Sequence, residues 1–283
     1  MAALTNRKSP PACGACCRRP VFAFRLCCID NPSQTRYHEA ILSKRGDSSM
    51  KTALITGGSR GIGAQLVRDF SAAGYRTVFL YRQDEEAARR MQAETGAQPI
   101  RCDVRFSDQV GQAVKAVGHI DVLINNAAIA QQKLFTDITD EDWRAMVDTA
   151  LSGAFYVTRA ALPGMISRRW GRIINISSIW GQVGASCEVH YSAAKAGLIG
   201  LTRALAKEVA PSGVTVNCLC PGVIATDMLS SFTPDDLEAL RQETPVGRLG
   251  TPQDVSAAAL WLAQEQSAFL TGQIIGVNGG FGE

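Results

Sequence analysis

Short apolar stretches alternate with helical segments along this 283-residue chain from about residue 51 onwards. We predict strands near 52–56, 76–81, 98–102, 120–124, 171–177, 213–219 and 273–277. The longest helical segments are expected at 140–169, with a break at Pro163, and at 189–210. Such alternation predicts an α/β fold in which helices cover both faces of one doubly wound parallel sheet of about seven strands. Ligands of such sheets bind beyond the carboxyl ends of the strands.

A glycine-rich turn follows the first predicted strand and opens a helical pattern. It reads Thr-Gly-Gly-Ser-Arg-Gly-Ile-Gly from Thr56 to Gly63, and Leu66, Val67 and Phe70 follow at the spacing of a helix core. Glycines permit a tight turn and the close approach of a pyrophosphate, whose charge is favourable at a helix N-terminus. A glycine-rich stretch alone is more often only a turn, but between a strand and a helix it predicts a dinucleotide site.

Three polar residues further along the chain have the types and spacing of a catalytic acid–base set. Tyr191 and Lys195 are four residues apart in a predicted helix, so they share one helix face. A neighbouring ammonium favours phenolate, so we expect the pKa of Tyr191 to fall from ~10 towards neutral and the phenol to act as a general acid. Ser178 follows the strand 171–177, and its hydroxyl could hold a carbonyl oxygen against the phenol. A Tyr-x-x-x-Lys pair alone is a weak signal, and its weight here depends on the glycine-rich turn.

Together these motifs resemble those of the short-chain dehydrogenase/reductase family, and the resemblance covers Lys51 to Glu283. The matching pieces are the turn from Thr56 to Gly63, Asp103, Asn125-Asn126-Ala127, Ser178, Tyr191-x-x-x-Lys195, Pro221-Gly222 with Thr226, and Val277-Asn278-Gly279-Gly280. The resemblance implies a Rossmann-like fold, an oxidoreductase of the CH–OH/C=O pair, and a homotetramer or dimer. It also implies that Tyr191 is the acid–base, that Ser178 positions the carbonyl, and that Lys195 additionally binds the nicotinamide ribose.

The same resemblance assigns residues to the cofactor. The expected cofactor-binding residues are Thr56, Gly57, Ser59, Arg60, Gly61, Ile62, Gly63, Tyr81, Arg82, Asp103, Val104, Asn125, Ala127, Tyr191, Lys195, Pro221, Gly222, Ile224 and Thr226. Asp103 carries over as an adenine contact and Asn125 as a stabiliser of the central sheet. The segment from Pro221 to Thr226 carries over as the contact to the nicotinamide end. No metal ligand is expected in this set.

The charge after the second predicted strand indicates which dinucleotide is used. Enzymes that prefer NAD usually place an acid there, which accepts hydrogen bonds from the adenosine ribose. Here the strand runs into Tyr81-Arg82-Gln83, and Arg60 in the glycine-rich turn supplies a second guanidinium. Two arginines near the ribose would hold a 2′-phosphate by charge-assisted bonds, although either alone is more often a solvated surface residue. We therefore predict NADPH/NADP+ as the cofactor.

One position departs from the family pattern. A helix asparagine usually completes the catalytic set and holds a water beside the lysine, but the matching segment here places Ala150 at that position. Either the variant is tolerated, with water or cofactor hydroxyls carrying the proton, or turnover is weakened. The second possibility motivates a hypothesis of a different class, a non-catalytic NADPH-binding scaffold or sensor.

The substrate is less constrained, although the segment 179–190 should line its pocket. Segments at 212–217, 221–227 and 244–250 resemble bacterial 3-oxoacyl-[acyl-carrier-protein] reductases of fatty-acid biosynthesis, which reduce β-keto thioesters. The resemblance implies a small-molecule or carrier-protein-bound keto substrate. Arg168, Arg169 and Arg172, if near the site mouth, could steer an acidic carrier protein, or they could simply be a solvated helix end. Against this, 130–135 and 180–182 resemble the related elongation factor P 5-aminopentanone reductases. His190 could be a second proton donor but is more often structural at such a position.

Charge and cysteines set the first 49 residues apart. Residues 1–49 carry a net charge of +5, which leaves −2 for residues 50–283, so nothing in the catalytic body suggests nucleic-acid binding. Five of the nine cysteines lie in this extension, which could bind zinc, be a transit peptide, or precede a natural start at Met50. We prefer the last interpretation, with 1–49 disordered and 50–283 forming the NADP-binding domain. No apolar run is long enough for a membrane span, and a cytoplasmic location is expected.

Overall fold

The computed structural model describes residues 50–229 and 232–282, which belong to a compact unit assigned to Met50–Glu283. The expectations for the first 49 residues, namely disorder, a transit peptide, a zinc site or an upstream extension, lie outside the described residues. No helix among the described residues is long and apolar enough to cross a membrane.

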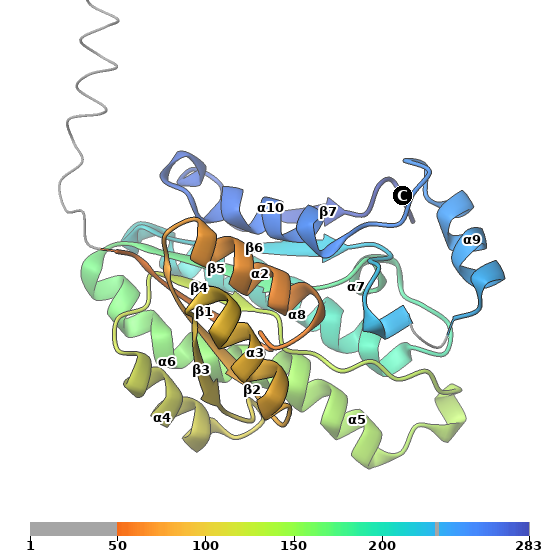
Figure 1. The fold of residues 1–283 in the computed structure, drawn as a ribbon, viewed down its shortest axis with the longest axis horizontal. Helices are drawn as coiled ribbons and strands as arrows, with labels where there is room; N and C mark the ends of the chain where they lie inside the picture. The colour runs from red at the N-terminus through yellow and green to blue at the C-terminus, as the bar shows by residue number, and fades with distance from the viewer. Residues whose placement is uncertain (1–49, 230–231, 283) are drawn as a thin grey trace, which may run out of the picture. The chain divides into compact units, whose positions relative to one another are not determined.

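Seven parallel strands form one sheet in the order β3-β2-β1-β4-β5-β6-β7 (Figure 1). The strands are β1 Thr52–Thr56, β2 Arg76–Tyr81, β3 Gln98–Arg101, β4 Val122–Asn125, β5 Gly171–Ile176, β6 Val214–Pro221 and β7 Ile274–Val277. The predicted fold class and strand number are confirmed. Every residue of β1, β4, β5 and β6 is buried. These strands are therefore mostly apolar on both faces rather than alternating, because helices cover both faces of the sheet, although β5 and β6 also bury polar side chains such as Arg172, Asn175 and Asn217.

Helices connect the strands. They are α2 Gly61–Ala72, α3 Glu85–Thr95, α4 Ser107–Val117, α5 Asp140–Val147, α6 Gly153–Arg168, α7 Trp180–Val183, α8 Val189–Val209, α9 Pro234–Glu243 and α10 Pro252–Ala263. Threonine capping boxes begin α5, α9 and α10, where Thr139, Thr233 and Thr251 each accept a hydrogen bond from the backbone three residues on. The Thr-x-x-Asp pattern thus fixes where these three helices start.

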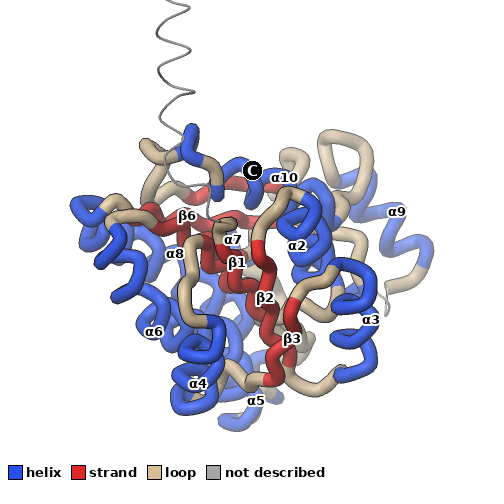
Figure 2. Tube along the Cα trace, turned by 60° about the vertical axis from the view of Figure 1, so that its left-hand side comes forward, coloured by secondary structure: helices blue, strands red, loops and turns tan. Residues whose placement is uncertain are grey.

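Figure 2 shows α2, α3 and α10 on one side of the sheet and α4, α6 and α8 on the other. An apolar cluster of side chains lies on each face. One contains Phe70 of α2, Met91 of α3 and Val255 of α10, packed against β1, β2 and β4. The other contains side chains of α4, α6 and α8, including Met165. Burial of each such large side chain contributes roughly 1.5–3 kcal/mol, so these two layers hold the strand order in place.

The predicted break of the long helix at Pro163 is wrong. Pro163 lies inside α6, and the irregularity is a π-helical turn at Asp148–Ser152, between α5 and α6. Proline removes one intrahelical hydrogen bond, but Pro163 is exposed, so water can satisfy the carbonyl that loses its partner. The π turn instead faces the region where α5, α6 and α8 converge, and single π turns are frequent at functional sites.

The strand order reverses at β1. This strand pairs with β2 on one side and with β4 on the other, so the connections on the two sides run in opposite directions. At such a switch point the loops diverge beyond the carboxyl ends of the strands and leave room for a ligand. The glycine-rich turn follows β1 at this point.

Candidate active site

The glycine-rich turn adopts a conformation that side chains would block. Gly57 and Gly61 have φ of 67° and 54°, in the left-handed region that favours glycine. A Cβ added to Gly63 would overlap the carbonyl oxygen of Gly57 and lie 2.6 Å from the side-chain nitrogen of Asn126. The first turn of α2 therefore packs directly on the backbone of the loop before it.

Asn126 holds this turn against β4. Its side-chain amide donates to the carbonyl oxygens of Thr56 at 3.0 Å and Gly57 at 3.1 Å. The hydroxyl of Thr56 in turn accepts the backbone N–H groups of Asn126 and Ala127, both at 2.9 Å. Sequence reasoning quoted Asn126 within a family motif but did not place it in the site. A polar residue directly after a buried strand was the available signal.

The residues present fit a pyrophosphate. Arg60 occupies the N-cap of α2, its side chain does not cap the helix, and the first turn carries no acidic residue. The first backbone N–H groups of a helix lack intrahelical partners and, with the helix dipole, attract an anion. A Cβ added to Gly61 would lie 3.7 Å from the Thr226 methyl group, so the loop after β6 lies beside this turn.

The remaining cofactor candidates lie at the same edge of the sheet. Thr56, Tyr81, Asn125 and Pro221 end β1, β2, β4 and β6. Of the other candidates, Gly61, Ile62 and Gly63 form the first turn of α2, Tyr191 and Lys195 lie in α8, and the rest occupy the loops that follow these strands and β3. Asn125 is buried and donates to the hydroxyl of Thr158 at 2.9 Å and to the side chain of Asn175 at 2.8 Å. Its contacts thus lie within the sheet and α6, as expected for a residue that stabilises the sheet.

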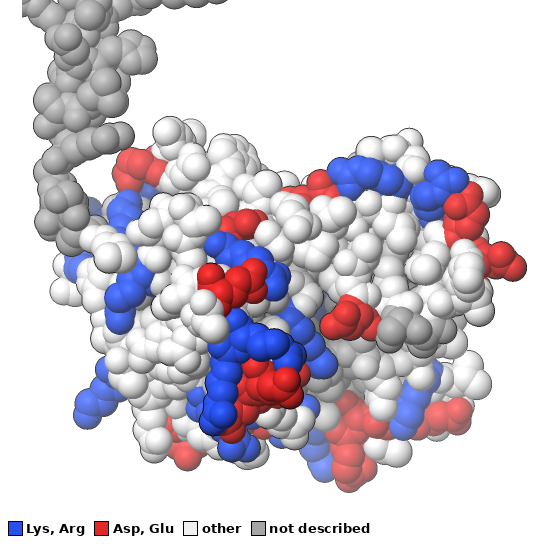
Figure 3. Space-filling view, in the orientation of Figure 1, with Lys and Arg blue, Asp and Glu red and all other residues white. Residues whose placement is uncertain are grey.

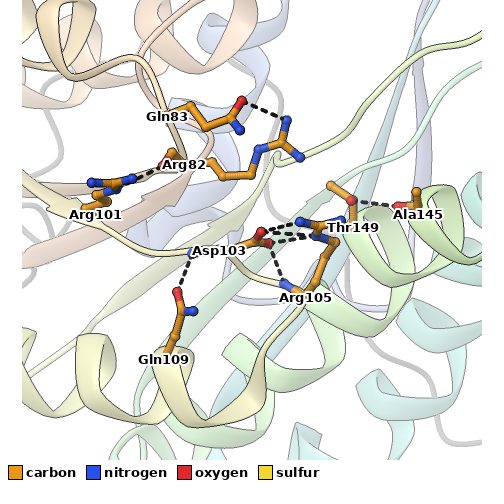
Figure 4. Close-up of polar contacts among 8 residues, drawn as sticks. All are labelled: Arg82, Gln83, Arg101, Asp103, Arg105, Gln109, Ala145 and Thr149. Carbon is orange, nitrogen blue, oxygen red and sulfur yellow. Dashed lines mark hydrogen bonds and ion pairs between the residues drawn. The ribbon is translucent and has the colours of Figure 1, made fainter.

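Asp103 is already engaged by an arginine (Figure 4). Arg105 donates to its carboxylate from Nε at 3.0 Å and from Nη2 at 2.6 Å. Burial acts to raise the pKa of Asp103, but the hydrogen bonds from Arg105 outweigh it and lower the pKa. The carboxylate therefore stays ionised, and its charge is balanced within the loop after β3.

Ser178, Tyr191 and Lys195 meet above the end of β5. The Lys195 ammonium donates to the carbonyl oxygen of Ile176 at 2.7 Å and lies 5.6 Å from the centroid of the Tyr191 ring. The hydroxyl of Ser177 donates to the Lys195 carbonyl at 2.8 Å, which ties α8 to the end of the strand. A hydrogen bond from Ser178 acts on the Tyr191 phenol. The structure thus brings the three predicted residues together.

The expected direction of the Tyr191 pKa shift is wrong. Burial raises the pKa of this phenol to about 12, against the opposing hydrogen bond from Ser178. Burial also lowers the pKa of Lys195 to about 8. Loss of water disfavours the charged form of either group, and here it outweighs the benefit of placing an ammonium near a phenol. The phenol is therefore protonated across the neutral range.

Ala150 lies in the π turn, in an apolar cluster with Met146, Tyr191 and Ala194. Its side chain is 2% exposed, and the neighbouring Thr149 hydroxyl donates back to the carbonyl of Ala145 at 2.7 Å. An asparagine at this position would place its amide in that cluster. The π turn is therefore present in this chain without the asparagine of the family pattern.

The loop after β4, which contains residues 131–133, is hydrogen-bonded to the segment at residues 187–190, which leads into α8 and Tyr191. The Lys133 backbone N–H donates to the carbonyl of Cys187 at 2.8 Å, and the side chain of Gln132 donates to Glu188 at 3.3 Å. His190 Nε2 lies 3.0 Å from the side-chain oxygen of Gln131. Cys187 has φ of 60°, a strained value for a non-glycine residue, and such strain persists only where surrounding contacts impose it. His190 is fully buried in this arrangement, which agrees with the structural interpretation of that residue.

Glu188 is an acidic residue of these two segments that has no cationic partner among the described residues. Burial raises its pKa, against the hydrogen bond from Gln132, and its charge also raises the pKa of Tyr191. No Lys, Arg or His among the described residues forms an ion pair with it, whereas Lys133 is paired with Asp142 at 2.6 Å. A half-buried carboxylate near the phenol thus has no cation of its own.

The arginines expected near the site mouth lie elsewhere. Arg172 is the second residue of β5, at the amino end of the sheet, and is 2% exposed. Arg168 donates to the carbonyl of Ile120, just before β4. The candidate site lies beyond the carboxyl ends of the strands, whereas Arg168 and Arg172 lie at their amino ends. These two arginines are therefore at the opposite edge of the sheet and cannot steer a carrier protein into the site. Figure 3 shows basic and acidic side chains intermingled on the face that it displays. On α3, Arg89 pairs with Glu85 and Arg90 pairs with Glu86.

The described part of the chain offers no set of ligands for a metal ion. No group of three or more His, Cys, Asp or Glu side chains among residues 50–229 and 232–282 could hold a metal ion.

Comparisons with known proteins identify similar reductases. A family model described as Enoyl-(Acyl carrier protein) reductase matches residues 57–282. An acetoacetyl-CoA reductase from Shinella zoogloeoides is 42% identical over 235 residues, which cover 81% of this chain and 98% of that protein. The 3-oxoacyl-[acyl-carrier-protein] reductase FabG of Aquifex aeolicus (strain VF5) is 37% identical over 81% of this chain and 96% of its own length.

A solved structure is similar over most of the chain. The crystal structure of a 3-oxoacyl-[acyl-carrier protein] reductase from Brucella melitensis ATCC 23457 superposes with a TM-score of 0.78 at 32% identity. The match covers 82% of this chain and 91% of that one.

Proposed function

The chain belongs to the short-chain dehydrogenase/reductase family and is an oxidoreductase of the C=O/CH–OH pair, and we propose that it uses NADPH to reduce a ketone to a secondary alcohol. The observation that carries this proposal is the convergence of Ser178, Tyr191 and Lys195 at the same sheet edge as the glycine-rich turn. The names of the relatives support a 3-oxoacyl thioester as the first candidate substrate.

The reaction needs one hydride and one proton. NADPH, when bound, supplies the hydride to the carbonyl carbon. The Tyr191 phenol donates its proton to the carbonyl oxygen as negative charge develops there, and Ser178 donates a hydrogen bond to the same oxygen. The Lys195 ammonium stabilises the phenolate that remains and would also bind the ribose hydroxyls. Because its burial keeps the phenol protonated at neutral pH, Tyr191 is ready to act as an acid.

The cofactor preference rests on charge at the end of β2. Arg82 follows this strand, and the next acid along the chain, Asp84, caps α3 by accepting the Ala87 N–H at 2.9 Å. No carboxylate therefore stands where an NAD-dependent enzyme would bind the ribose hydroxyls. This arrangement supports NADPH.

Reduction should slow as the pH rises through about 8. Lys195 loses its proton there, because burial has lowered its pKa to about 8, whereas Tyr191 keeps its proton to about 12. Since the mechanism needs both groups protonated, kcat/KM for NADPH should fall up to ~10-fold per pH unit above that value. The check is a pH–rate profile from pH ~6 to ~10, with circular dichroism to confirm that the protein stays folded. A profile that is flat to pH ~10 would contradict the role given to Lys195.

A second candidate substrate is favoured by Glu188. A half-buried carboxylate without a cation is unfavourable, and a positively charged group on the substrate would compensate it. The 5-aminopentanone group on elongation factor P, suggested by the resemblance at 130–135 and 180–182, carries a primary ammonium at neutral pH. The 3-oxoacyl thioesters carry no such charge beside their keto group.

Replacing Glu188 by Gln should separate these two candidates. Glutamine keeps the volume and a polar partner for Gln132 but removes the negative charge. If the substrate is an amino ketone, kcat/KM for 5-(trimethylammonio)-2-pentanone, which keeps the positive charge but cannot cyclise to an imine, should fall roughly 10- to 100-fold, as expected when its charge partner is lost. The uncharged N-acetyl-5-amino-2-pentanone and acetoacetyl thioesters should be reduced as in the wild type. An equal loss on all three substrates would mean that Glu188 supports the loop rather than recognising an ammonium.

The expectations about the catalytic domain, the cellular location, the pathway and the oligomeric state are also proposals. We propose that residues 50–283 form the catalytic domain without the extension, because β1 begins at Thr52 and the family match begins at residue 57. A cytoplasmic location, a role in fatty-acid biosynthesis and a homotetramer or dimer rest on the family resemblance. Nothing in the catalytic body's charge suggests nucleic acid as a partner.

A further inference from the structure

His190, the residue before Tyr191, is a buried histidine that the proposed reaction does not use. It is the second residue of α8, and its side chain is fully buried. Its Nε2 lies 3.0 Å from the side-chain oxygen of Gln131, in the loop after β4. Its Nδ1 is buried and has no hydrogen-bond partner among the described residues. One nitrogen of the imidazole is therefore engaged and the other is not.

Gln131 determines which nitrogen of this imidazole carries the proton. The Gln131 side-chain nitrogen donates to one carboxylate oxygen of Asp142 at 2.8 Å, and the Lys133 ammonium donates to the other at 2.6 Å. The hydrogen bonds from Lys133 and Gln131 hold the pKa of Asp142 well below its usual range, so its carboxylate is ionised and can only accept. The Gln131 nitrogen must therefore face Asp142, and its oxygen must face His190. His190 accordingly donates from Nε2, and Nδ1 keeps a bare lone pair.

The surroundings of His190 favour its neutral form. Burial lowers the pKa of the imidazole and outweighs the opposing charge of Asp142, and the charge of Lys133 lowers the pKa further. A proton on Nδ1 would also be a buried donor without an acceptor, which is unfavourable. His190 is thus a fixed hydrogen-bond donor near neutral pH rather than a second proton donor for the ketone.

The hydrogen bonds that run from His190 through Gln131 to Asp142 link three elements around the phenol. His190 belongs to α8, Gln131 to the loop after β4, and Asp142 to the first turn of α5. Ile129 of the same loop packs against the apolar cluster that contains Tyr191. Fixing Gln131 therefore holds this loop beside the group that acts on the ketone.

We propose that His190 is a positioning residue of the ketone reduction: its Nε2–H fixes the loop at residues 129–133 through Gln131, and the loop holds the ketone against the Tyr191 phenol. The inference rests on the proposed function and goes beyond it by assigning the residue that fixes this wall of the substrate site. His190 itself does not touch the ketone, because its side chain is fully buried. Its effect should therefore appear in ketone binding and not in cofactor binding.

Replacing His190 by Leu, Gln and Asn in the full-length protein tests this role. Leucine removes the donor, so KM for the ketone should rise roughly 10-fold, the loss expected when a hydrogen-bond partner is left unsatisfied, while kcat and NADPH affinity stay close to wild type. Glutamine carries a donor at the same number of bonds from Cα as Nε2 and should restore the wild-type KM. Asparagine carries its donor at the position of Nδ1, which has no partner, and should resemble leucine.

The ketones for these measurements are acetoacetyl thioester and N-acetyl-5-amino-2-pentanone. Neither carries an ammonium group, so the charge of Glu188 does not contribute to the comparison. NADPH titrations and melting temperatures of each variant accompany the rates and show whether the fold and the cofactor site are intact.

A double-mutant cycle with Gln131→Leu shows whether the two residues act through one contact. The KM effects of His190→Leu and Gln131→Leu should not add, because each change breaks the same hydrogen bond. Additive effects, or rescue by asparagine instead of glutamine, would overturn the inference. An equal loss of ketone and NADPH affinity in all three His190 variants, with lowered melting temperatures, would show that the residue only supports the fold and would overturn it as well. A wild-type protein that binds NADPH and reduces no ketone would instead refute the proposed function, on which the inference rests.

Discussion

Replacing Tyr191 by Phe should remove nearly all ketone reduction and leave NADPH affinity almost unchanged. The phenolic proton is the one that the mechanism transfers to the carbonyl oxygen, and phenylalanine retains the ring that packs with Ala150 and Ala194. A general acid typically contributes about 10²–10⁴-fold to the rate, so kcat/KM should fall by that factor. Steady-state rates measured with acetoacetyl thioester and with 5-(trimethylammonio)-2-pentanone, beside NADPH titrations, check this expectation.

Tyr156→Phe is the matched control for that experiment. Tyr156 is a partly buried tyrosine of α6, and its hydroxyl makes no hydrogen bond among the described residues. The control variant should retain wild-type rates and the same melting temperature. If Tyr191→Phe keeps more than a tenth of the wild-type kcat/KM, the assignment of the proton donor is wrong.

Replacing Gly63 by Ala should strongly impair cofactor binding. The added Cβ would overlap the Gly57 carbonyl oxygen and approach the Asn126 amide to 2.6 Å. Because the first obstacle is backbone, no side-chain rotation can relieve the overlap, and the glycine-rich turn must move away from α2. We expect NADPH affinity to fall by at least ~100-fold and stability by roughly 1–3 kcal/mol, the usual cost of overpacking.

Gly111→Ala serves as the control for the added methyl group. Gly111 lies in α4, has no positive φ, and a Cβ there would meet nothing within 4 Å. Alanine is the better helix former, so this variant should be stabilised by about 0.5–1 kcal/mol and bind NADPH normally. Calorimetric NADPH affinity and thermal melts of both variants provide the comparison. Wild-type affinity in Gly63→Ala would mean that the turn does not hold the cofactor.

Local sequence patterns were sufficient for the strands and for the edge where the site lies. Runs such as Thr52–Thr56 have an apolar centre without alternation because both faces of the strand are buried, and this pattern is visible in a single sequence. The glycine-rich turn and the Tyr191–Lys195 spacing are short-range features, so their positions followed once the parallel sheet was expected. The placement of these residues at the carboxyl edge is therefore a consequence of topology.

Properties that depend on tertiary environment were not accessible in the same way. The pKa of Tyr191 is raised because the phenol is buried, and burial cannot be read from the spacing to Lys195. Arg172 lies at the amino end of its strand, so its distance from the site follows from strand direction rather than from sequence proximity to Ser178.

The irregularity between α5 and α6 shows another limit. Pro163 was the expected break, because proline removes a helix hydrogen bond, yet the helix continues through it on an exposed face. The π turn at Asp148–Ser152 contains neither glycine nor proline and has no local signal of that kind. It lies where α5, α6 and α8 meet beside Tyr191, so tertiary packing is the physical cause that remains.

The most direct test of the proposed ketoreductase is deuterium transfer from labelled NADPH to the carbinol carbon of the product alcohol. NADPH labelled separately at each C4 position would be incubated with the wild-type protein and either candidate ketone, and the alcohol analysed by mass spectrometry. The account predicts one deuterium per alcohol from one of the two labelled cofactors and none from the other. Absence of labelled alcohol with every ketone, in a protein that binds NADPH tightly, would contradict the account and favour a non-catalytic NADPH-binding sensor or scaffold.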